Sequence, residues 1–358
     1  MSEQNLEPIE LARRKVTSLE STLDSVRAKT SLRQVLDALE DIDSQLSALP
    51  GTLARLRARG YVFKNFLETD VSSVQSEWPT TRPRVQADLD VQRRILSSQM
   101  DDLSTRFLQS RTVLELDPAQ AGLALAMVEA SAQSLDRTAT SAISTLQGMY
   151  NGVQSRLRKV QSDIKKAETV LNEVDNASFK LYPEEQIIDV MEGQWLTDDK
   201  GGAKGFLFCT DHRLIFEQRE EVATKKVLFF ATEKQKVQRL ALEAPVGAVT
   251  DVKESESGAL IMRKDHLELV FGPQSTVRSA HFILKGDSAE WQRLINRVNA
   301  GEMEKERVKP ADAPKAEDKP KVTAPSQCSA CGARFTQEIV RGMKSIKCQY
   351  CGTVTRLE

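Results

Sequence analysis

Four of the five cysteines lie near the end of the chain, in two pairs whose spacing suits metal binding. Cys328 and Cys331 form one Cys-x-x-Cys pair, Cys348 and Cys351 form a second, and sixteen residues separate the pairs. Two tight turns of this kind present four thiolates to one tetrahedral ion, and zinc favours such a set. We therefore predict a structural Zn²⁺ site with these four ligands. Because four thiolates fill the coordination shell, we do not expect a catalytic zinc.

A glycine follows each pair, at Gly332 and Gly352. A thiolate turn folds back on its own backbone, and glycine permits the positive φ that this needs. The segment resembles a zinc ribbon over about residues 327–358. The resemblance implies a small fold that owes its folding energy to the metal. A redox dithiol is the alternative interpretation of the two pairs.

The ribbon has a basic segment that raises the question of its partner. Arg341, Lys344 and Lys347 could form a basic edge for nucleic acid, or simply a solvated face. The −2 charge of a zinc ion with four thiolates offsets much of the basic excess. Nucleic acid is therefore the less favoured partner, and we expect a protein partner instead.

Residues 4–176 show the pattern of long helices. Sparse breaks at Pro50-Gly51, Pro79–Pro83 and Asp117-Pro118 predict four helices, at about 5–48, 52–77, 84–116 and 118–176. Asp117 is placed as an N-cap, followed by proline at the first helical position. Short connections between such helices favour an antiparallel bundle.

Apolar residues recur in the first and last helices at alternating steps of three and four, which is typical of coiled-coil packing. In the last helix this heptad series runs to Val153, where an extra step of four to Leu157 forms a stutter. The first helix shows a phase slip between Val26 and Val35. The residues of the last helix are Leu125, Val128, Ala132, Leu135, Ala139, Ala142, Leu146, Met149, Val153, Leu157, Val160, Ile164, Ala167, Leu171 and Val174.

The unequal helix lengths favour self-association through the coiled coil. A curved, membrane-facing bundle is the alternative, with cationic patches at Arg55, Arg57 and Arg59 and at Arg156-Leu-Arg158-Lys159. Ordinary solvated helix faces would also explain each cluster.

From about residue 181 the apolar segments become short and β-rich. One amphipathic helix, Asp287–Ala300, closes the region, capped by Asp287 or Ser288 and burying Trp291, Leu294, Ile295 and Val298. Nine candidate strands precede it: Gln186–Met191, Lys204–Thr210, Arg213–Glu217, Val227–Thr232, Val237–Leu242, Ala248–Val252, Ala259–Arg263, His266–Phe271 and Ala280–Leu284.

The segment Gly205-Phe-Leu-Phe-Cys-Thr210-Asp-His-Arg213-Leu-Ile-Phe216 resembles a hairpin of GRAM and bacterial pleckstrin-homology-like (PH-like) domains. The acidic opening at Pro183-Glu184-Glu185 and the tryptophan of the closing helix resemble that family too. The likeness covers about residues 181–300. It implies a seven-stranded, strongly bent sheet capped by the helix, with Trp291 as a core residue and two of the nine strands as loops or split strands.

Members of that family commonly bind lipid headgroups or protein segments. The candidate contacts for an anionic surface here are Lys200, Lys204, Arg213, Lys225 and Lys226. However, Asp198 and Asp199 lie beside the first lysine, and apolar residues follow Arg213. Too few cations converge for a strong phosphoinositide site, whereas weak contact with an anionic membrane stays open.

The overall organisation is multidomain α+β. We expect a helical bundle over 1–178, a PH-like domain over 181–301, a linker over 302–326 and a zinc ribbon over 327–358. The linker has four prolines and balanced charges, so we expect it to be extended and mobile and to leave the ribbon tethered rather than docked.

Composition excludes several classes of function. The chain has 358 residues, 28% of them charged, and a formal net charge of −1, which argues against a chain-wide polyanion-binding field. No apolar run could span a bilayer and no secretory signal is visible, so we expect a cytoplasmic protein, with peripheral membrane attachment left open.

Catalytic motifs are absent from the sequence, and the three histidines and the lone Cys209 lie in no recognised motif. We therefore expect no enzyme. The leading hypothesis is an oligomeric adaptor or scaffold, whose PH-like domain engages a membrane surface or a protein segment and whose tethered zinc ribbon recruits a partner. The alternatives are a nucleic-acid-associated regulator that acts through the ribbon, and a membrane-remodelling coat built from the long helices.

Overall fold

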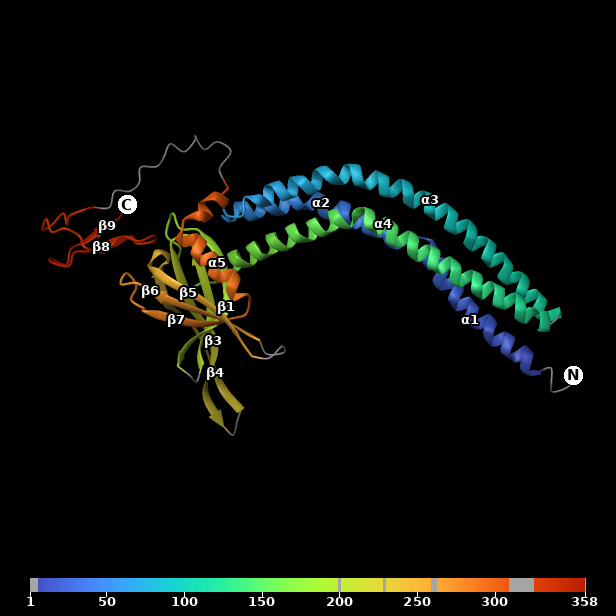
Figure 1. Cartoon of the computed structure of the whole chain (residues 1–358). Coiled ribbons are helices and arrows are strands. Elements are labelled where there is room, and N and C mark those ends of the chain that lie inside the picture. The colour runs from blue at the N-terminus through green and yellow to red at the C-terminus, as the bar shows by residue number, and fades with distance from the viewer. Residues whose placement is uncertain are drawn as a thin grey trace. The chain divides into compact units, whose positions relative to one another are not determined.

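The computed structural model describes residues 6–116, 118–198, 201–227, 230–258, 263–308 and 325–357 (Figure 1). Contacts divide the chain into two compact units. The first joins Met1–Thr52 with Glu68–Ser162, and the second joins Leu53–Leu67 with Asp163–Glu358. Within the described ranges, none of the helices has the length and apolar character needed to cross a membrane.

Helices α1 (Leu6–Thr30), α2 (Arg33–Ala58), α3 (Phe66–Leu116) and α4 (Pro118–Asp175) confirm the predicted bundle. Their directions follow from ion pairs in the first unit. Arg82 of α3 pairs with Asp43 of α2, and Arg111 of α3 pairs with Glu20 of α1. Rising numbers on α3 therefore meet falling numbers on α1 and α2. Arg156 of α4 pairs with Glu77 of α3, and Lys159 pairs with Asp70, so that α4 is antiparallel to α3 as well.

The first helix break differs from the prediction. It falls at Ser31–Leu32, where Leu32 has a φ of +53° and is fully buried, and not at Pro50. Pro50 lies inside α2, where it cannot donate to the carbonyl of Leu46. The Gln75 side chain donates to that carbonyl instead, at 3.4 Å. The sequence signal for the true break was the phase slip between Val26 and Val35.

The predicted break at Pro79–Pro83 is also wrong, since both prolines lie inside α3. The hydroxyls of Thr80 and Thr81, between the two prolines, donate to the Glu77 carbonyl. The chain turns instead at residues 59–65, where Gly60 has a φ of +94° and Lys64 a φ of +59°. Asp117, the predicted N-cap, lies outside the described residues.

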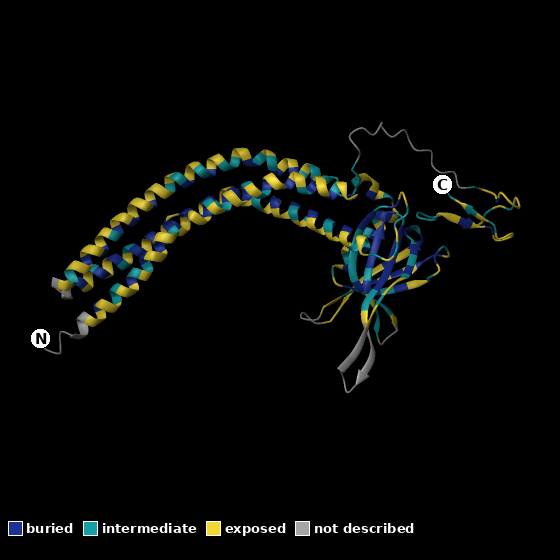
Figure 2. Ribbon diagram, turned by 180° about the vertical axis from the view of Figure 1, so that it is seen from behind, coloured by how far each residue is buried: buried dark blue, intermediate teal, exposed yellow. Residues whose placement is uncertain are grey.

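The heptad positions form the core of the bundle, and Figure 2 shows buried residues as a stripe along each helix. At the stutter, the predicted core position of α4 is wrong by one residue. Tyr150 is buried, whereas the predicted Met149 is partly exposed. An extra step of four moves the contact line around the helix, so that the neighbouring residue faces the core.

Seven strands within the described residues form one antiparallel sheet of order β4-β3-β2-β1-β7-β6-β5, followed by α5 (Ser288–Asn299). This is the predicted PH-like layout. The strands are β1 (Ile187–Asp198), β2 (Gly201–Thr210), β3 (Arg213–Val227), β4 (Phe230–Pro245), β5 (Val249–Ser257), β6 (Lys264–Phe271) and β7 (Ser279–Leu284).

Two of the nine candidate strands are not separate strands. The candidate Val227–Thr232 includes the last residue of β3 and the first residues of β4, and Val237–Leu242 lies within β4. β3 and β4 form one long hairpin, in which Arg213 pairs with Pro245 at one end and Val227 with Phe230 at the other. The candidate Ala259–Arg263 lies largely outside the described residues.

Helix α5 closes the sheet as expected. The Asp287 side chain accepts from the backbone N–H groups of Ala289 and Glu290 and so forms the N-cap. Trp291 is 1% exposed and belongs to the core, although its indole nitrogen has no hydrogen-bond partner among the described residues. Leu294 is only half-buried, in contrast to its predicted burial.

The expected linker is ordered at its beginning. A short 3₁₀ helix, η3 (Glu302–Glu306), buries Met303, and the Val308 N–H donates to the Val62 carbonyl at 2.7 Å. This part is held because Met303 supplies an apolar side chain that the charged segment otherwise lacks. Strands β8 (Ser345–Lys347) and β9 (Val354–Arg356) form the ribbon hairpin.

Candidate functional site

The four C-terminal cysteines come together as the sequence predicts. Their sulfur atoms all lie within 4.8 Å of one another, and none forms a disulfide. Sγ of Cys328 is 3.6 Å from Sγ of Cys351, and Sγ of Cys331 is 3.6 Å from Sγ of Cys348. Ligands about 2.3 Å from a tetrahedral zinc ion lie about 3.8 Å apart, so the donor set fits a four-thiolate metal site.

Two similar backbone turns position these thiols. The Gly332 N–H donates to the Cys328 carbonyl, and the Gly352 N–H donates to the Cys348 carbonyl. Their φ angles are +72° and +77°, which confirms the predicted need for glycine. The hairpin β8–β9 supports the second turn, with Ile346 buried beneath it.

Hydrogen bonds favour the thiolate form of two of the four cysteines. Backbone N–H groups of Cys351 and Tyr350 lower the pKa of Cys348. The hydroxyl and backbone N–H of Thr353 lower the pKa of Cys351 to about 6. By contrast, against the backbone N–H of Ala333, hydrogen bonds with Cys351 and Cys348 raise the pKa of Cys331 to about 12. Since metals bind thiolates rather than thiols, Cys348 and Cys351 are the better prepared ligands.

Arg213, a candidate contact for an anionic surface, is buried within the PH-like domain. Its guanidinium donates to both carboxylate oxygens of Glu185, at 2.7 and 2.8 Å, and to Glu243 at 2.5 Å. The side chains of Arg213 and Glu185 are 6% and 0% exposed. The hydroxyl of Thr210 also donates to Glu185, at 2.7 Å. The guanidinium therefore holds the β2–β3 hairpin to the segment before β1 and does not face an external anion.

The other predicted cations are not brought together with Arg213. Lys204 is exposed on β2. Lys225 and Lys226 lie near the far end of the β3–β4 hairpin, opposite Glu233 and Ala231 in register. Lys200 lies outside the described residues.

The basic segment of the ribbon is engaged with the PH-like domain, which differs from the expected free tether. Arg341 donates to the backbone carbonyl of Asp211 and to Glu304, both at 2.9 Å. The Lys344 ammonium lies 3.8 Å from the ring centre of Tyr182. Sequence reasoning missed this contact, and the only signal for it was the Arg341-Gly342 dipeptide between the cysteine pairs.

The fifth cysteine and the three histidines lie in the PH-like domain. Cys209 is fully buried in β2, and burial raises the pKa of its thiol, so it is not a reactive thiolate. His266 and His281 contact each other across β6 and β7, with Nδ1 of the first 2.9 Å from Nε2 of the second. The ring of His212 contacts Asp211 in the β2–β3 turn at 2.7 Å.

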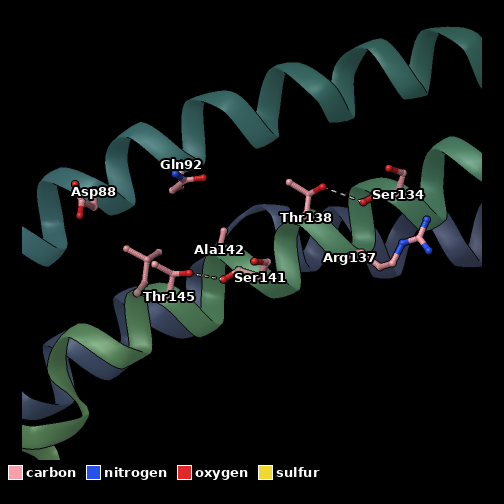
Figure 3. A pocket seen from close by; sticks show the side chains of 9 residues that line it. Asp88, Gln92, Ser134, Arg137, Thr138, Ser141, Ala142 and Thr145 are labelled. Atoms are coloured by element: carbon pink, nitrogen blue, oxygen red, sulfur yellow. Dashed lines mark hydrogen bonds between the residues drawn. The ribbon is translucent and has the colours of Figure 1, made fainter.

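A groove between α3 and α4 is one of several hollows of the helical unit that could hold a ligand (Figure 3). The hydroxyls of Thr138 and Thr145 donate to the carbonyls of Ser134 and Ser141 within α4 itself. No histidine or cysteine occurs among its described lining residues, which are Asp88, Gln92, Ser134, Arg137, Thr138, Ser141, Ala142, Thr145 and Leu146.

Comparisons with known proteins return structural likeness only. No protein-family model matches the sequence, and no curated protein matches it. The Vps36 N-terminal PH domain is similar over 33% of this chain and 82% of its own, at 17% identity and a TM-score of 0.22. The DH/PH domains of p115-RhoGEF are similar over 83% and 94%, at 11% identity and a TM-score of 0.22. The DH/PH domains of PDZ-RhoGEF, in a complex with activated RhoA, are similar over 83% and 95%, at 12% identity and a TM-score of 0.24.

Proposed function

We propose that the protein is a non-enzymatic adaptor that self-associates through its helices, holds a protein segment on its PH-like domain and recruits a further partner through a zinc-bound ribbon. The carrying observation is the burial of Arg213 against Glu185. The one arginine of the predicted anion-binding set is thereby neutralised inside the domain, which favours a protein segment over a lipid headgroup as the ligand. Several weak contacts on one oligomer then act together.

The metal cluster supports a structural role for zinc. Four thiol groups surround one point, so a bound ion has no free position for water or substrate. The ion would hold the two cysteine turns together and thereby shape the segment between them. Chemistry at this site would be confined to binding.

Self-association is supported by apolar side chains on α4. Leu123 and Met127 lie one turn apart on the same helix face and are 71% and 64% exposed. Large apolar groups at this spacing suit contact with a second copy of the helical unit.

Co-sedimentation with liposomes separates the protein-segment version from the membrane version. The full chain would be mixed with neutral vesicles and with vesicles that contain anionic lipid, at low and physiological salt. We expect equal and minimal sedimentation with both. Salt-sensitive binding to the anionic vesicles would overturn the choice of a protein segment.

Nucleic-acid binding by the ribbon is a second candidate, favoured by one observation. Tyr350, at the tip of the second cysteine turn, is 74% exposed, and Lys347 and Arg356 are exposed in the adjoining strands. An exposed ring beside cations can stack on an unpaired base. Binding of a single-stranded oligonucleotide that weakens steeply with salt would support it, and a flat salt response would exclude it.

A further inference from the structure

The segment between the two cysteine pairs makes a turn whose tip lies on the PH-like domain. The Met343 N–H donates to the Val340 carbonyl at 3.2 Å and closes the four-residue turn. Gly342 is the third residue of the turn and has a φ of +86°, as such turns require when they carry glycine there. Arg341 therefore projects from a defined backbone conformation.

Backbone contacts join this turn to two loops of the PH-like domain. The Gly247 N–H, in the 3₁₀ turn η2 (Val246–Ala248), donates to the Arg341 carbonyl at 3.0 Å. The Arg341 Nε donates to the carbonyl of Asp211, in the β2–β3 turn, at 2.9 Å. The PH-like domain thus binds both the backbone carbonyl and the guanidinium of Arg341.

Glycine is required on both sides of the contact. A Cβ atom on Gly342 would lie 1.7 Å from the carbonyl oxygen of His212. A Cβ atom on Gly247 would lie 2.4 Å from the backbone nitrogen of Arg341. Real Cβ atoms do not approach other atoms so closely, so the two backbones meet at a distance that larger residues would prevent. The close fit at these two glycines indicates a specific contact between the ribbon and the PH-like domain.

The receiving surface is fixed by its own bonds. The Asp211 carboxylate accepts from the Gln186 N–H at 2.8 Å and from Arg307 at 2.7 Å, and its side chain is 2% exposed. Arg307 in turn pairs with Glu304 at 2.9 Å, which leaves a Glu304 oxygen 2.9 Å from Nη2 of Arg341. The acceptors for the arginine are thus held in place before it arrives, which lowers the entropic cost of binding.

The geometry points to an Arg-Gly recognition site on the PH-like domain, formed by the turn Asp211-His212, Gly247 and Glu304. The ribbon's own Arg341-Gly342 fills this site in cis. A protein segment that presents arginine followed by glycine at the tip of a turn is the external ligand that this site would accept. This inference deepens the proposed function, because it names the surface and the chemistry of the bound segment.

Because Arg341-Gly342 occupies the site in cis, an external segment must compete with it. Residues 309–324 join the segment after η3 covalently to the ribbon, and a short covalent link typically gives an effective concentration on the order of 1 mM. If the cis segment itself has an intrinsic Kd of about 100 µM for the site, it would weaken the apparent binding of an external segment about tenfold. An external segment must therefore bind more tightly or arrive in several linked copies.

Amide hydrogen exchange in the full chain tests the cis contact. Wild type, Gly342→Ala and Arg341→Ala would be compared, with Arg334→Ala as the control because Arg334 is an exposed arginine of the same ribbon. We expect the peptide that contains Gly247 to exchange faster in Gly342→Ala and in Arg341→Ala than in wild type, and to stay protected in Arg334→Ala. Equal exchange in all four proteins, each with its metal content verified, would overturn the docked state.

Peptide binding tests recognition independently of the tether. The probe is a fluorescent peptide with the sequence of residues 337–345, and its control carries alanine in place of the arginine. We expect Gly342→Ala to bind the probe about tenfold more tightly than wild type does, and Glu304→Gln combined with Gly342→Ala to lose that gain. Equal binding of the probe and its control peptide would overturn the recognition site, while leaving the adaptor proposal to its own experiments.

Discussion

Arg213 and Glu185 form a two-pronged ion pair inside the PH-like domain, with donor–acceptor distances of 2.7 and 2.8 Å. Thr210 donates to the same carboxylate, and the backbone N–H of Tyr182 donates to its second oxygen. The pair thereby fixes the start of the domain to the β2–β3 hairpin. The same hairpin turn supplies Asp211 and His212 to the contact with the ribbon.

Removal of one partner from this pair should destabilise the domain strongly. Arg213→Ala leaves the Glu185 carboxylate buried without its countercharge, for which the expected cost is about 3–5 kcal/mol. Urea unfolding followed by tryptophan fluorescence would measure the loss. Arg293→Ala, on the exposed face of α5, is the control and should change stability by less than about 0.5 kcal/mol. A loss in Arg213→Ala no larger than in the control would contradict a structural role for the pair.

Stability should fall as pH drops through the range in which free histidine titrates. Burial, the neighbouring His281 and Lys264 lower the pKa of His266 below its usual value of 6.5, despite the opposing Glu268 and Asp265. The unfolded chain then takes up a proton before the folded chain does, so that the contribution of His266 is complete above about pH 6.5 and is lost below it.

The variant His266→Gln tests this pH dependence, because glutamine does not titrate in this range. Thermal unfolding at pH 7.5 and 5.5 should show a smaller decrease for the variant than for wild type. Identical decreases in both proteins would show that the contact between Nδ1 of His266 and Nε2 of His281 has no part in it.

Loss of one cysteine ligand should release the metal. The full chain should carry one zinc ion, and Cys328→Ser should carry less than a tenth of that under the same chelator concentration, because three thiolates bind a tetrahedral ion much more weakly. Elemental analysis after gel filtration measures the ratio. Cys209→Ala, which removes the buried thiol of β2, should retain the full ratio. Full retention by Cys328→Ser would refute the four-thiolate site.

Charges on the exposed face of α4 should weaken self-association. The double variant Leu123→Glu, Met127→Glu places two carboxylates where an apolar contact is expected, and should raise the dimer dissociation constant by tenfold or more. Sedimentation equilibrium measures this constant. Ser155→Glu adds a charge at an exposed position of α4 about eight turns further along and should have little effect. A wild-type chain that stays monomeric at high concentration would contradict the coiled-coil contact.

Local chemistry explains which features the sequence could predict. The positive φ of Gly332 and Gly352, the N-cap at Asp287 and the burial of Trp291 depend on residues within a few positions, so that spacing alone indicated them. The seven-stranded order followed the resemblance of one hairpin. Prolines misled because α2 and α3 bury enough apolar surface to continue through Pro50, Pro79 and Pro83.

Features that depend on distant residues could not be predicted. Arg213 looked like a surface cation because its partners, Glu185 and Glu243, lie 28 and 30 residues away along the chain. Arg341 meets Asp211 across 130 residues, and the contact depends on close backbone approach at two glycines. Neither periodicity nor motif spacing carries information of that kind.

Quantitative cross-linking and affinity capture with the intact chain tests the adaptor proposal most directly. Wild type would be compared with the double variant Cys328→Ser/Cys331→Ser, and with Cys209→Ala as the matched thiol control. The account predicts a reproducible set of bound proteins, of which one part is lost only from the double variant and another part is retained through the PH-like domain. Identical sets from all three proteins and from bare resin would contradict the claim that this chain recruits partners through two separate modules.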